Sequence, residues 1–275
     1  MRIYKVLVER EFPKGTTLKE VLMKLVPLSE AVLADAAHKG AVWLQRGGKG
    51  KILRVRLLSE KLSPKDSIQF YYDPLVLKLP EVTDASCVYQ NSNYGVWVKK
   101  AGVVPQGTQT SDHASLLRYV ERVRGHEVFL IHRLDRETEG LMIIGYTSRA
   151  AGLLGDLFQK NQIKKEYGAV VLGSIPRGKK ETITASLDDK VAITHFEVLD
   201  SSQGLSLLRI HIETGRLHQI RRHLDFIGHP VMGDPKYGRG NKNKEGLQLL
   251  AQYLSFKDPF DGDTKEWQLE NRLTL

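Results

Sequence analysis

The chain has 275 residues, of which 41% are hydrophobic and 27% charged, enough for one large core or for one large and one small core. Its 41 lysines and arginines exceed its 32 aspartates and glutamates, and the formal net charge of +9 favours a polyanionic partner such as nucleic acid, unless the excess is scattered over the surface. The single cysteine, Cys87, excludes an internal disulfide framework and a thiolate metal cluster, so we expect a cytoplasmic protein.

The first 80 residues predict a small α+β unit. Residues 1–15 alternate apolar and charged side chains, which indicates a strand rather than a secretory signal or a membrane anchor. The first helix is expected where a threonine start and a proline stop enclose four apolar residues at helical spacing: Leu18, Val21, Leu22 and Leu25. The expected elements that follow are a helix in 29–40 ending at Gly40, two short strands around a glycine-rich turn in 41–57, and a strand in 63–73.

This order of elements resembles that of S4-type RNA-binding domains, with "QRGG" at 45–48 where those domains usually have asparagine-glycine. The resemblance implies an RNA-binding role, and the alternative is an unrelated small helix-and-hairpin cap. Residues 73–84 carry two prolines and no helical period, as expected of a linker. We therefore predict an S4-like domain over 1–80 and a second domain over 81–275.

Strands and helices in the second domain are interspersed without a βαβ period. The expected elements are a strand in 94–102, a helix from Ser111 or Asp112 to Gly125 with Leu116, Val120 and Val123 on one stripe, a buried strand in 141–146, a helix in 148–162 with Leu153, Leu154, Leu157 and Phe158 facing inward, and a strand in 164–173. Alternation along this last strand puts Lys165 and Tyr167 on one face. Tyr167 is expected to be half-buried, either lining a pocket or packed in the core.

The stretch "HRLDRETEG" at 132–140 places Asp135 between Arg133 and Arg136, immediately before the buried strand. For an isolated D-R-E-T sequence, the favoured interpretation is a loop whose aspartate caps a turn and whose arginines are solvated. A reactive carboxylate between two RNA-contacting arginines is the alternative, and it depends on the motifs that accompany this one.

Residues 213–238 contain three histidines, His218, His223 and His229, which suggest a zinc site. At about 100° per residue, His218 and His223 would be roughly 140° apart on a helix, and His229 follows the stop at Gly228. No accompanying pattern supplies further ligands, so we expect no metal.

The same angular argument applies to the arginines of this segment. Leu217, Ile220, Leu224 and Ile227 would form the apolar stripe of the helix. Arg222 would point away from that stripe, whereas Arg221 would lie on its border with its guanidinium at the rim of the core. Arg221 is thus placed to meet a carboxylate in a pocket.

Three stretches, "HRLDRETEGLMIIG", "KKEYGAVVLG" and "TGRLHQIRRHLDFIGHPVMGDPKYG", together resemble in this order the three signature motifs of the RluA-type pseudouridine synthases, and "VWVKKAGVV" resembles the strand and loop that precede them. The resemblance covers most of 85–260. It implies an α+β fold with a mixed, mainly antiparallel central sheet and flanking helices. It also implies isomerisation of uridine to pseudouridine in RNA without a cofactor.

The resemblance assigns roles residue by residue. Asp135 matches the catalytic aspartate, Tyr167 the tyrosine that stacks on the target base, and Arg221 the basic partner of the aspartate. Arg133 matches the arginine that enters the helix when the nucleotide leaves it. The remaining expected RNA contacts are Arg136, Lys165, Arg216, His218, Gln219 and Arg222. His132 and Thr138 are expected to support the loop, and 228–238 to support the site.

The expected roles of the aspartate, its basic partner and the aromatic ring have a physical explanation. Burial favours the protonated form of a carboxylic acid, and an adjacent cation such as Arg221 favours the ionised, nucleophilic form. A stacked uracil has to be extruded at a cost of about a few kcal/mol, of which stacking on an aromatic ring returns about 1–3 kcal/mol. The chain departs from the family at Lys100, Glu139 and Leu250, where proline, serine and histidine are usual, and none of these is an expected reactive position.

The sequence therefore predicts a cytoplasmic, monomeric RNA pseudouridine synthase that acts on ribosomal RNA of the large subunit, with transfer RNA as the second choice. The competing hypotheses are a non-catalytic RNA-binding protein on the same scaffold and a histidine-metal hydrolase. The first hypothesis requires that Asp135 and Arg221 point toward each other and that Tyr167 lies on the same side of the sheet.

Overall fold

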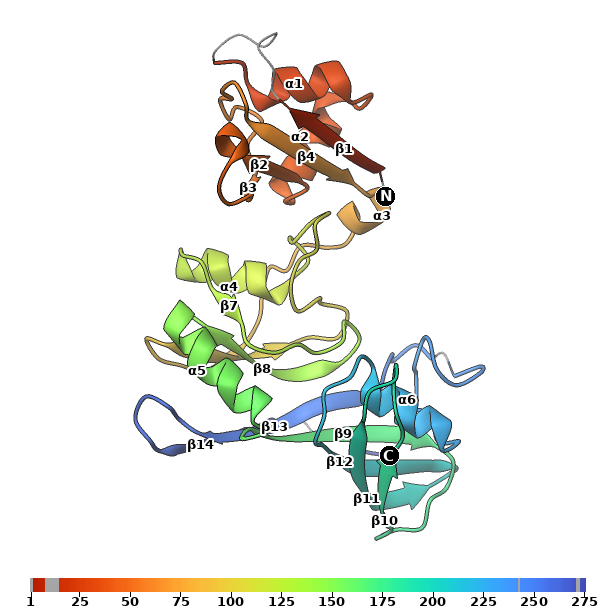
Figure 1. The fold of residues 1–275 in the computed structure, drawn as a ribbon. Coiled ribbons are helices and arrows are strands. Elements are labelled where there is room, and N and C mark those ends of the chain that lie inside the picture. The colour runs from red at the N-terminus through yellow and green to blue at the C-terminus, as the bar shows by residue number, and fades with distance from the viewer. Residues whose placement is uncertain (1, 8–14, 242, 271–272) are drawn as a thin grey trace. The chain divides into compact units, whose positions relative to one another are not determined.

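The computed structural model describes residues 2–7, 15–241, 243–270 and 273–275 (Figure 1). The chain forms two compact units, one made of 1–83 with 106–122 and the other of 84–105 with 123–275. The division into a domain of 1–80 and a domain of 81–275 stays a prediction.

The N-terminal unit contains a four-stranded antiparallel sheet in the order β1-β4-β2-β3. Its elements are β1 (Arg2–Leu7), α1 (Leu18–Leu25), α2 (Glu30–His38), β2 (Val42–Gln45), the 3₁₀ turn η1 (Arg46–Gly48), β3 (Leu53–Val55), β4 (Ser67–Tyr72) and α3 (Pro74–Leu77). Residues 8–14 of the expected first strand lie outside the described residues. The other predicted elements of this unit form where expected.

Two details of this unit differ from the prediction. Leu25 is 44% exposed, because α1 ends there and the extended residue Val26 takes the buried position instead. The expected linker contains the short helix α3, where the Asp73 side chain accepts a hydrogen bond from the Leu75 amide and Leu77 is buried. Whether this unit is related to S4 domains stays a prediction.

The C-terminal unit is built on one large sheet in the order β10-β11-β12-β9-β13-β8-β6-β5, with β14 beside β13 and β7 beside β8. The strands are β5 (Cys87–Gln90), β6 (Tyr94–Lys99), β7 (Phe129–Leu130), β8 (Glu139–Gly145), β9 (Lys164–Leu172), β10 (Lys180–Thr184), β11 (Ile193–Ser202), β12 (Leu205–Ile212), β13 (Leu249–Lys257) and β14 (Thr264–Gln268). The β13–β8 pair is parallel and the other described pairs are antiparallel. The predicted mixed, mainly antiparallel sheet is confirmed.

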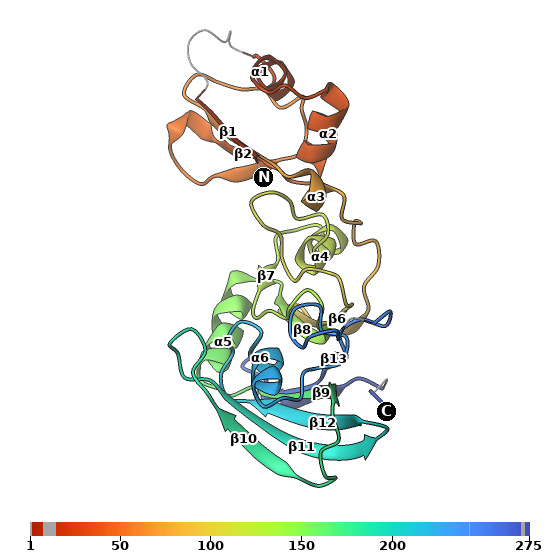
Figure 2. The same ribbon diagram turned by 90° about the vertical axis from the view of Figure 1, so that its right-hand side faces the viewer.

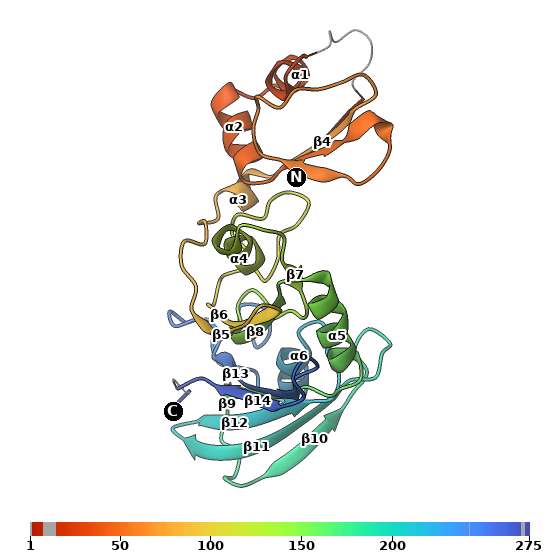
Figure 3. The ribbon, with the colours of Figure 1, turned by 90° about the vertical axis from the view of Figure 1, so that its left-hand side faces the viewer.

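The helices α5 (Ser148–Gln159) and α6 (Gln219–Phe226) lie on the same face of this sheet (Figures 2 and 3). The Thr147 side chain caps α5 by accepting a hydrogen bond from the Ala150 amide. Leu154 is buried, and the other three expected inward residues of α5 are partly buried. The face that carries α5 and α6 is therefore the one on which a site can be enclosed.

Two helix predictions need correction. The helix α4 (Leu116–Arg124) begins four or five residues later than expected, because the Ser115 hydroxyl caps it by accepting a hydrogen bond from the Arg118 amide, and Val123 is 57% exposed. Leu217 is 57% exposed and precedes α6, so it is not part of the apolar stripe. That stripe consists of buried Ile220 and Leu224.

The start of β8 requires glycine. Gly140 has φ +135°, and a Cβ atom there would lie 2.3 Å from the carbonyl oxygen of Ala251 on β13. Any larger residue would separate β8 from β13 at the point where their parallel pairing begins, at Leu250 and Glu139. This close approach fixes the loop of 131–138, which enters β8, against the centre of the sheet.

Candidate active site

A cavity of about 710 Å³ opens in the C-terminal unit. It is lined by residues 132–135 and 138 of the loop before β8, by the end of α5, by Lys165 and Tyr167 of β9, by residues 212–221 and by Leu249. This volume suits a small organic ligand such as a nucleoside. Asp135, Tyr167 and Arg221, expected to act together, all line it.

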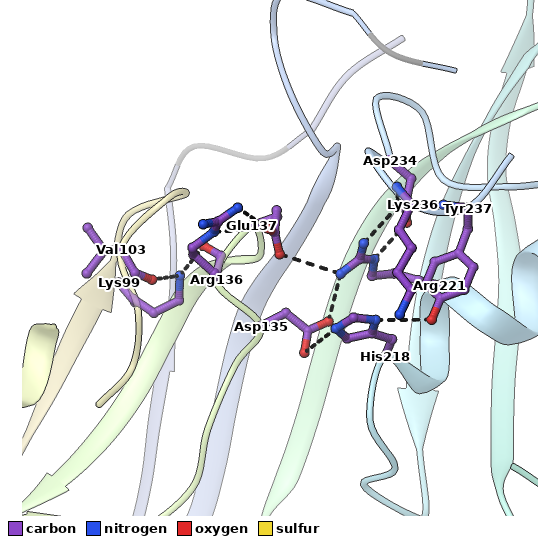
Figure 4. Close-up of polar contacts among 10 residues, drawn as sticks. All are labelled: Lys99, Val103, Asp135, Arg136, Glu137, His218, Arg221, Asp234, Lys236 and Tyr237. Carbon is purple, nitrogen blue, oxygen red and sulfur yellow. Dashed lines mark hydrogen bonds and ion pairs between the residues drawn. The ribbon is translucent and has the colours of Figure 1, made fainter. Parts of the chain in front are cut away.

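Arg221 lies at the centre of the charged groups (Figure 4). Its side chain is 1% exposed, so the guanidinium is fully buried rather than at the rim of the core as expected. Its Nε and Nη2 donate to the two carboxylate oxygens of Asp234 at 2.7 and 2.8 Å, and Nη1 donates to Asp135 Oδ2 at 3.3 Å. Burial alone would lower the pKa of Arg221. The hydrogen bonds to Asp234 and the negative charge of Asp234 outweigh this effect and raise the pKa.

Asp234 comes from the turn that follows α6. Its side chain is completely buried, and Oδ1 also accepts hydrogen bonds from the backbone amides of Lys236 and Tyr237 at 2.8 and 3.0 Å. Burial alone would raise the pKa of Asp234, but Arg221 and these amides hold it below the ordinary value. The expectation that 228–238 supports the site is thus confirmed, through a residue that was not itself predicted.

Asp135 faces the cavity with its side chain 18% exposed. Its Oδ2 meets Arg221, and its Oδ1 lies 3.9 Å from Nε2 of His218. Glu137 places a third carboxylate near the guanidinium, 3.6 Å from Nη1. Burial alone would raise the pKa of Glu137, but its hydrogen bonds and the positive charges of Arg136 and Arg221 lower it. Asp135 and Arg221 point toward each other, as the hypothesis of a nucleophilic aspartate requires.

His132, which is partly buried, holds the loop that carries Asp135. His132 accepts a hydrogen bond from the Ile143 amide at Nε2 (3.0 Å) and stacks on Phe158 with ring centroids 4.4 Å apart. Burial lowers the pKa of His132 to about 3, so the ring is neutral, and its predicted supporting role is confirmed. Thr138, expected to help, is buried.

Lys99, at the end of β6, is fully buried, and its Nζ donates to the carbonyl oxygens of Lys100 (3.0 Å), Val103 (2.8 Å) and Arg136 (2.9 Å), as Figure 4 shows in part. Burial lowers the pKa of Lys99 to about 8, so at neutral pH it is still mostly protonated and offers three N–H donors. It thereby ties the backbone next to Asp135 to the strand behind it.

Tyr167 is 8% exposed, more buried than expected, and its ring lines the cavity. The strand β9 fixes its position, because Tyr167 pairs with Ile210 of β12 and with Ala251 of β13. Burial and the negative charge of Asp135 raise the pKa of Tyr167, so the phenol stays neutral. A neutral aromatic ring on the wall of the cavity is a suitable surface for a flat base.

The expected RNA contacts divide into two groups. Arg133, Lys165, Arg216 and His218 line the cavity. Arg133 is exposed, Lys165 has its Nζ 5.5 Å from the ring centre of Phe158, and Arg216 donates from Nε to the Val191 carbonyl at 3.0 Å.

The second group is engaged within the protein. Gln219 also lines the cavity, but its amide is buried and bonded to Thr214, Thr194 and the backbone of Arg216 and Ile193. We therefore interpret it as support for the turn before α6 rather than as an RNA contact. Arg222 makes two hydrogen bonds to Asp188, at 2.8 and 3.1 Å, and is not among the residues that line the cavity. Arg136 pairs with Glu137 at 3.0 Å.

The three histidines that suggested zinc have separate partners. His218 bonds to Tyr237, His223 bonds to Thr194 and the Ala185 carbonyl, and His229 bonds to the Leu172 carbonyl. Within the described residues, no group of three or more histidine, cysteine, aspartate or glutamate side chains is placed to hold a metal ion.

Sequence reasoning missed Lys99, Asp234 and Tyr237. Lys99 carries a usable signal, because it follows Trp97 on the alternating buried face of an otherwise apolar strand. Asp234 and Tyr237 lie in a turn of glycines and prolines whose side-chain directions cannot be read from spacing.

The fold and the site together define a class. An aspartate that pairs with a buried guanidinium, beside a neutral aromatic wall in a nucleoside-sized cavity on a mixed sheet, is suited to nucleophilic attack on a flat, electron-poor ring or its sugar. Comparisons with known proteins name that class. The family model described as RNA pseudouridylate synthase matches residues 93–226.

Individual relatives agree with the family model. The chain is 30% identical to ribosomal large subunit pseudouridine synthase D of Neisseria meningitidis, over 92% of this chain and 75% of that protein. It is 35% identical to an uncharacterized RNA pseudouridine synthase of Chloroflexus aurantiacus, over 64% of this chain but only 60% of that relative's length. The solved structure of human RNA pseudouridylate synthase domain containing 1 shares the fold, with a TM-score of 0.59 and 24% identity over 70% of this chain and 85% of that one. This protein belongs to the RluA-type family of RNA pseudouridine synthases.

None of the helices in the described part of the chain has the length and apolar character needed to cross a membrane.

Proposed function

We propose that this protein converts uridine to pseudouridine in RNA, with Asp135 as the nucleophile. The observation that carries the proposal is the 3.3 Å contact between Asp135 Oδ2 and Arg221 Nη1 inside the cavity that Tyr167 also lines. Arg221 pairs with the carboxylate of Asp135 and orients it, Tyr167 stacks on the extruded uracil, and Arg133, exposed at the cavity, fills the space that the nucleotide leaves. The reaction breaks the N1–C1′ bond and forms a C5–C1′ bond.

The substrate we propose is ribosomal RNA of the large subunit, with transfer RNA as the second choice. The names of relatives about 30% identical to this chain support the first choice, because they refer to the ribosomal large subunit. An S4-like role for the N-terminal unit in binding that RNA, a cytoplasmic location and a monomeric state belong to the same proposal.

The test is formation of pseudouridine in RNA by the purified protein. Total RNA from cells lacking the gene is incubated with the protein, and modified uridines are mapped. We expect modification at one or a few sites in large-subunit RNA. Asp135→Asn should reduce the rate at least about 10³-fold, because it removes the nucleophile, while RNA binding is retained.

A matched control makes the same change at Asp200, an exposed residue of β11 that does not line the cavity. Asp200→Asn should keep the wild-type rate. RNA binding without product on any RNA by the wild-type protein would favour the non-catalytic alternative instead.

A further inference from the structure

His218 has a left-handed backbone conformation. It precedes α6 with φ +53° and ψ 30°, in a region that is uncommon for residues other than glycine. Such a conformation persists only when the surroundings impose it, and it is often found at functional sites. Here it directs the imidazole to the cavity, where the side chain is 19% exposed.

The two ring nitrogens of His218 have different surroundings (Figure 4). Nδ1 lies 3.1 Å from the hydroxyl oxygen of Tyr237, whose ring meets the imidazole edge-on at 5.7 Å. Nε2 lies 3.9 Å from Oδ1 of Asp135, beyond hydrogen-bonding distance. One nitrogen is therefore held by the protein, while the other faces the carboxylate that we propose to react.

Charged groups surround the imidazole from three segments: Asp135 and Glu137 from the loop before β8, Arg221 from α6, and Lys236 from the turn that also carries Tyr237. Burial lowers the pKa of His218. Asp135 and Glu137 oppose this effect, and Arg221 and Lys236 add to it, with a net lowering. The ring is therefore mainly neutral at pH 7 and has a nitrogen able to accept a proton.

Isomerisation of uridine requires such an acceptor, because C5 loses a proton when it becomes the glycosidic carbon. Four other titratable residues that line the cavity are poorly suited to accept it. The Tyr167 phenol keeps its own proton, and His132 uses Nε2 to accept from the Ile143 amide. Lys165 extends over the ring of Phe158, and Glu213 pairs with His195 at 2.7 Å. We propose that His218 is a further catalytic residue, the general base that removes the C5 proton, an inference that rests on the proposed function.

The proposed step begins when the detached uracil has bonded to C1′ through C5. Nε2 takes the proton from C5, the C5–H electron pair forms the C5=C6 double bond, and the C6=N1 pair moves onto N1. The imidazolium forms beside the carboxylate of Asp135, which stabilises it. It then returns a proton to N1 through water, so that uracil loses one proton at C5 and gains one at N1. The step requires the tautomer in which Nδ1–H donates to the Tyr237 hydroxyl oxygen and the Nε2 lone pair is free.

The test uses His218→Gly. Glycine suits the left-handed backbone, so the loop is retained, and the missing ring leaves space for added imidazole. The substrate RNA carries either hydrogen or deuterium at C5 of its uridines. We expect the variant to lose about 10²–10³-fold in rate, to regain activity on addition of imidazole, and to show a larger C5 deuterium isotope effect than the wild type because proton removal has become rate-limiting.

Gln203→Gly is the matched control, since Gln203 also has a left-handed backbone (φ 52°) but lies in the turn between β11 and β12. It should keep the wild-type rate and not respond to imidazole. If His218→Gly does not fold, His218→Asn replaces it, because asparagine tolerates this backbone and cannot accept the proton.

Two results would overturn the inference: an unchanged rate, or a slow variant with neither imidazole rescue nor an increased isotope effect. In the second case His218 would only hold the loop. If the wild-type protein forms no pseudouridine on any RNA, it is the proposed function that fails, so the two failures are distinguishable.

Discussion

The two sides of Arg221 differ in a way that explains how one guanidinium serves both structure and reaction. On one side Asp234, completely buried, accepts from Nε and Nη2 at 2.7 and 2.8 Å. On the other side Asp135, 18% exposed, accepts only from Nη1 at 3.3 Å. The short, two-pronged contact fixes the plane of the guanidinium, and the longer, single contact leaves Asp135 accessible from the cavity.

Asp234 thus orients the guanidinium of Arg221, while Asp135 stays free to react. If Asp135 alone held Arg221, any reaction that consumed its charge would leave a buried cation without a partner. Asp234 keeps that cation compensated throughout the reaction. The comparison therefore predicts that loss of Asp234 affects stability first, whereas loss of Asp135 affects only the chemistry.

The largest effect on stability is expected from Asp234→Ala. It leaves the buried charge of Arg221 without its main partner, which should lower the free energy of unfolding by about 3–5 kcal/mol, as measured by urea denaturation. Asp135→Asn should change it by less than about 1 kcal/mol, because Arg221 keeps both hydrogen bonds to Asp234. Equal losses in the two variants would contradict the division between anchor and reactive partner.

The lowered pKa of Asp234 predicts that the stability of the protein depends on pH in the acidic range. The pKa of Asp234 is lowered in the folded protein from its ordinary value of 3.8, so the folded state binds this proton less readily than the unfolded state. Its contribution to stability is fully present above about pH 4 and is lost as the pH falls through the lowered value. Urea denaturation between about pH 5 and pH 3 should show a weaker pH dependence for Asp234→Asn than for the wild type, while exposed Asp200→Asn keeps the wild-type dependence.

Two neighbouring lysines extend the comparison to the loop of Asp135. Lys99→Met removes a buried ammonium group that donates to three carbonyl oxygens and should cost about 1–3 kcal/mol of stability. It should also lower kcat by about 10- to 100-fold by loosening the loop, with little change in KM.

Lys100→Met is the control, because Lys100 is 54% exposed and pairs only with exposed Asp84 among the contacts described. Its effect on stability should stay below about 1 kcal/mol. A larger effect from Lys100 than from Lys99 would mean that the buried ammonium group does not hold the loop.

Much of the fold could be predicted because its signals are local. The apolar run in 141–146, the alternation in 164–173, the threonine cap of α1 and the glycine after α2 each depend on a few adjacent residues. The starts of α4 and α6 were harder. Ser115 competes with Ser111 and Asp112 as a cap, and the turn that Gln219 holds depends on Thr194 and Ile193 of a distant strand.

For the site, the resemblance supplied Asp135, Tyr167 and Arg221, and the structure places all three on one cavity. The anchor Asp234 could not be predicted from spacing, because its partner is fixed by the packing of α6 against the turn after it. Helical angles placed Arg221 only at the border of the core for the same reason. An angle gives the direction of a side chain, whereas burial depends on what packs over it.

Arg221 and Arg222 provide a direct test of whether burial of an arginine determines its contribution to stability, and the effect expected at Arg222 is the smallest. They are adjacent in sequence, but Arg222 is 25% exposed and pairs with Asp188, which is 66% exposed. Water screens such a pair, so Arg222→Ala should lower the free energy of unfolding by less than about 1 kcal/mol. Arg221→Ala leaves Asp234 buried and unpaired and should cost several times more. Urea denaturation of the two variants measures the difference, and similar losses would show that burial of the guanidinium does not determine the strength of the contact.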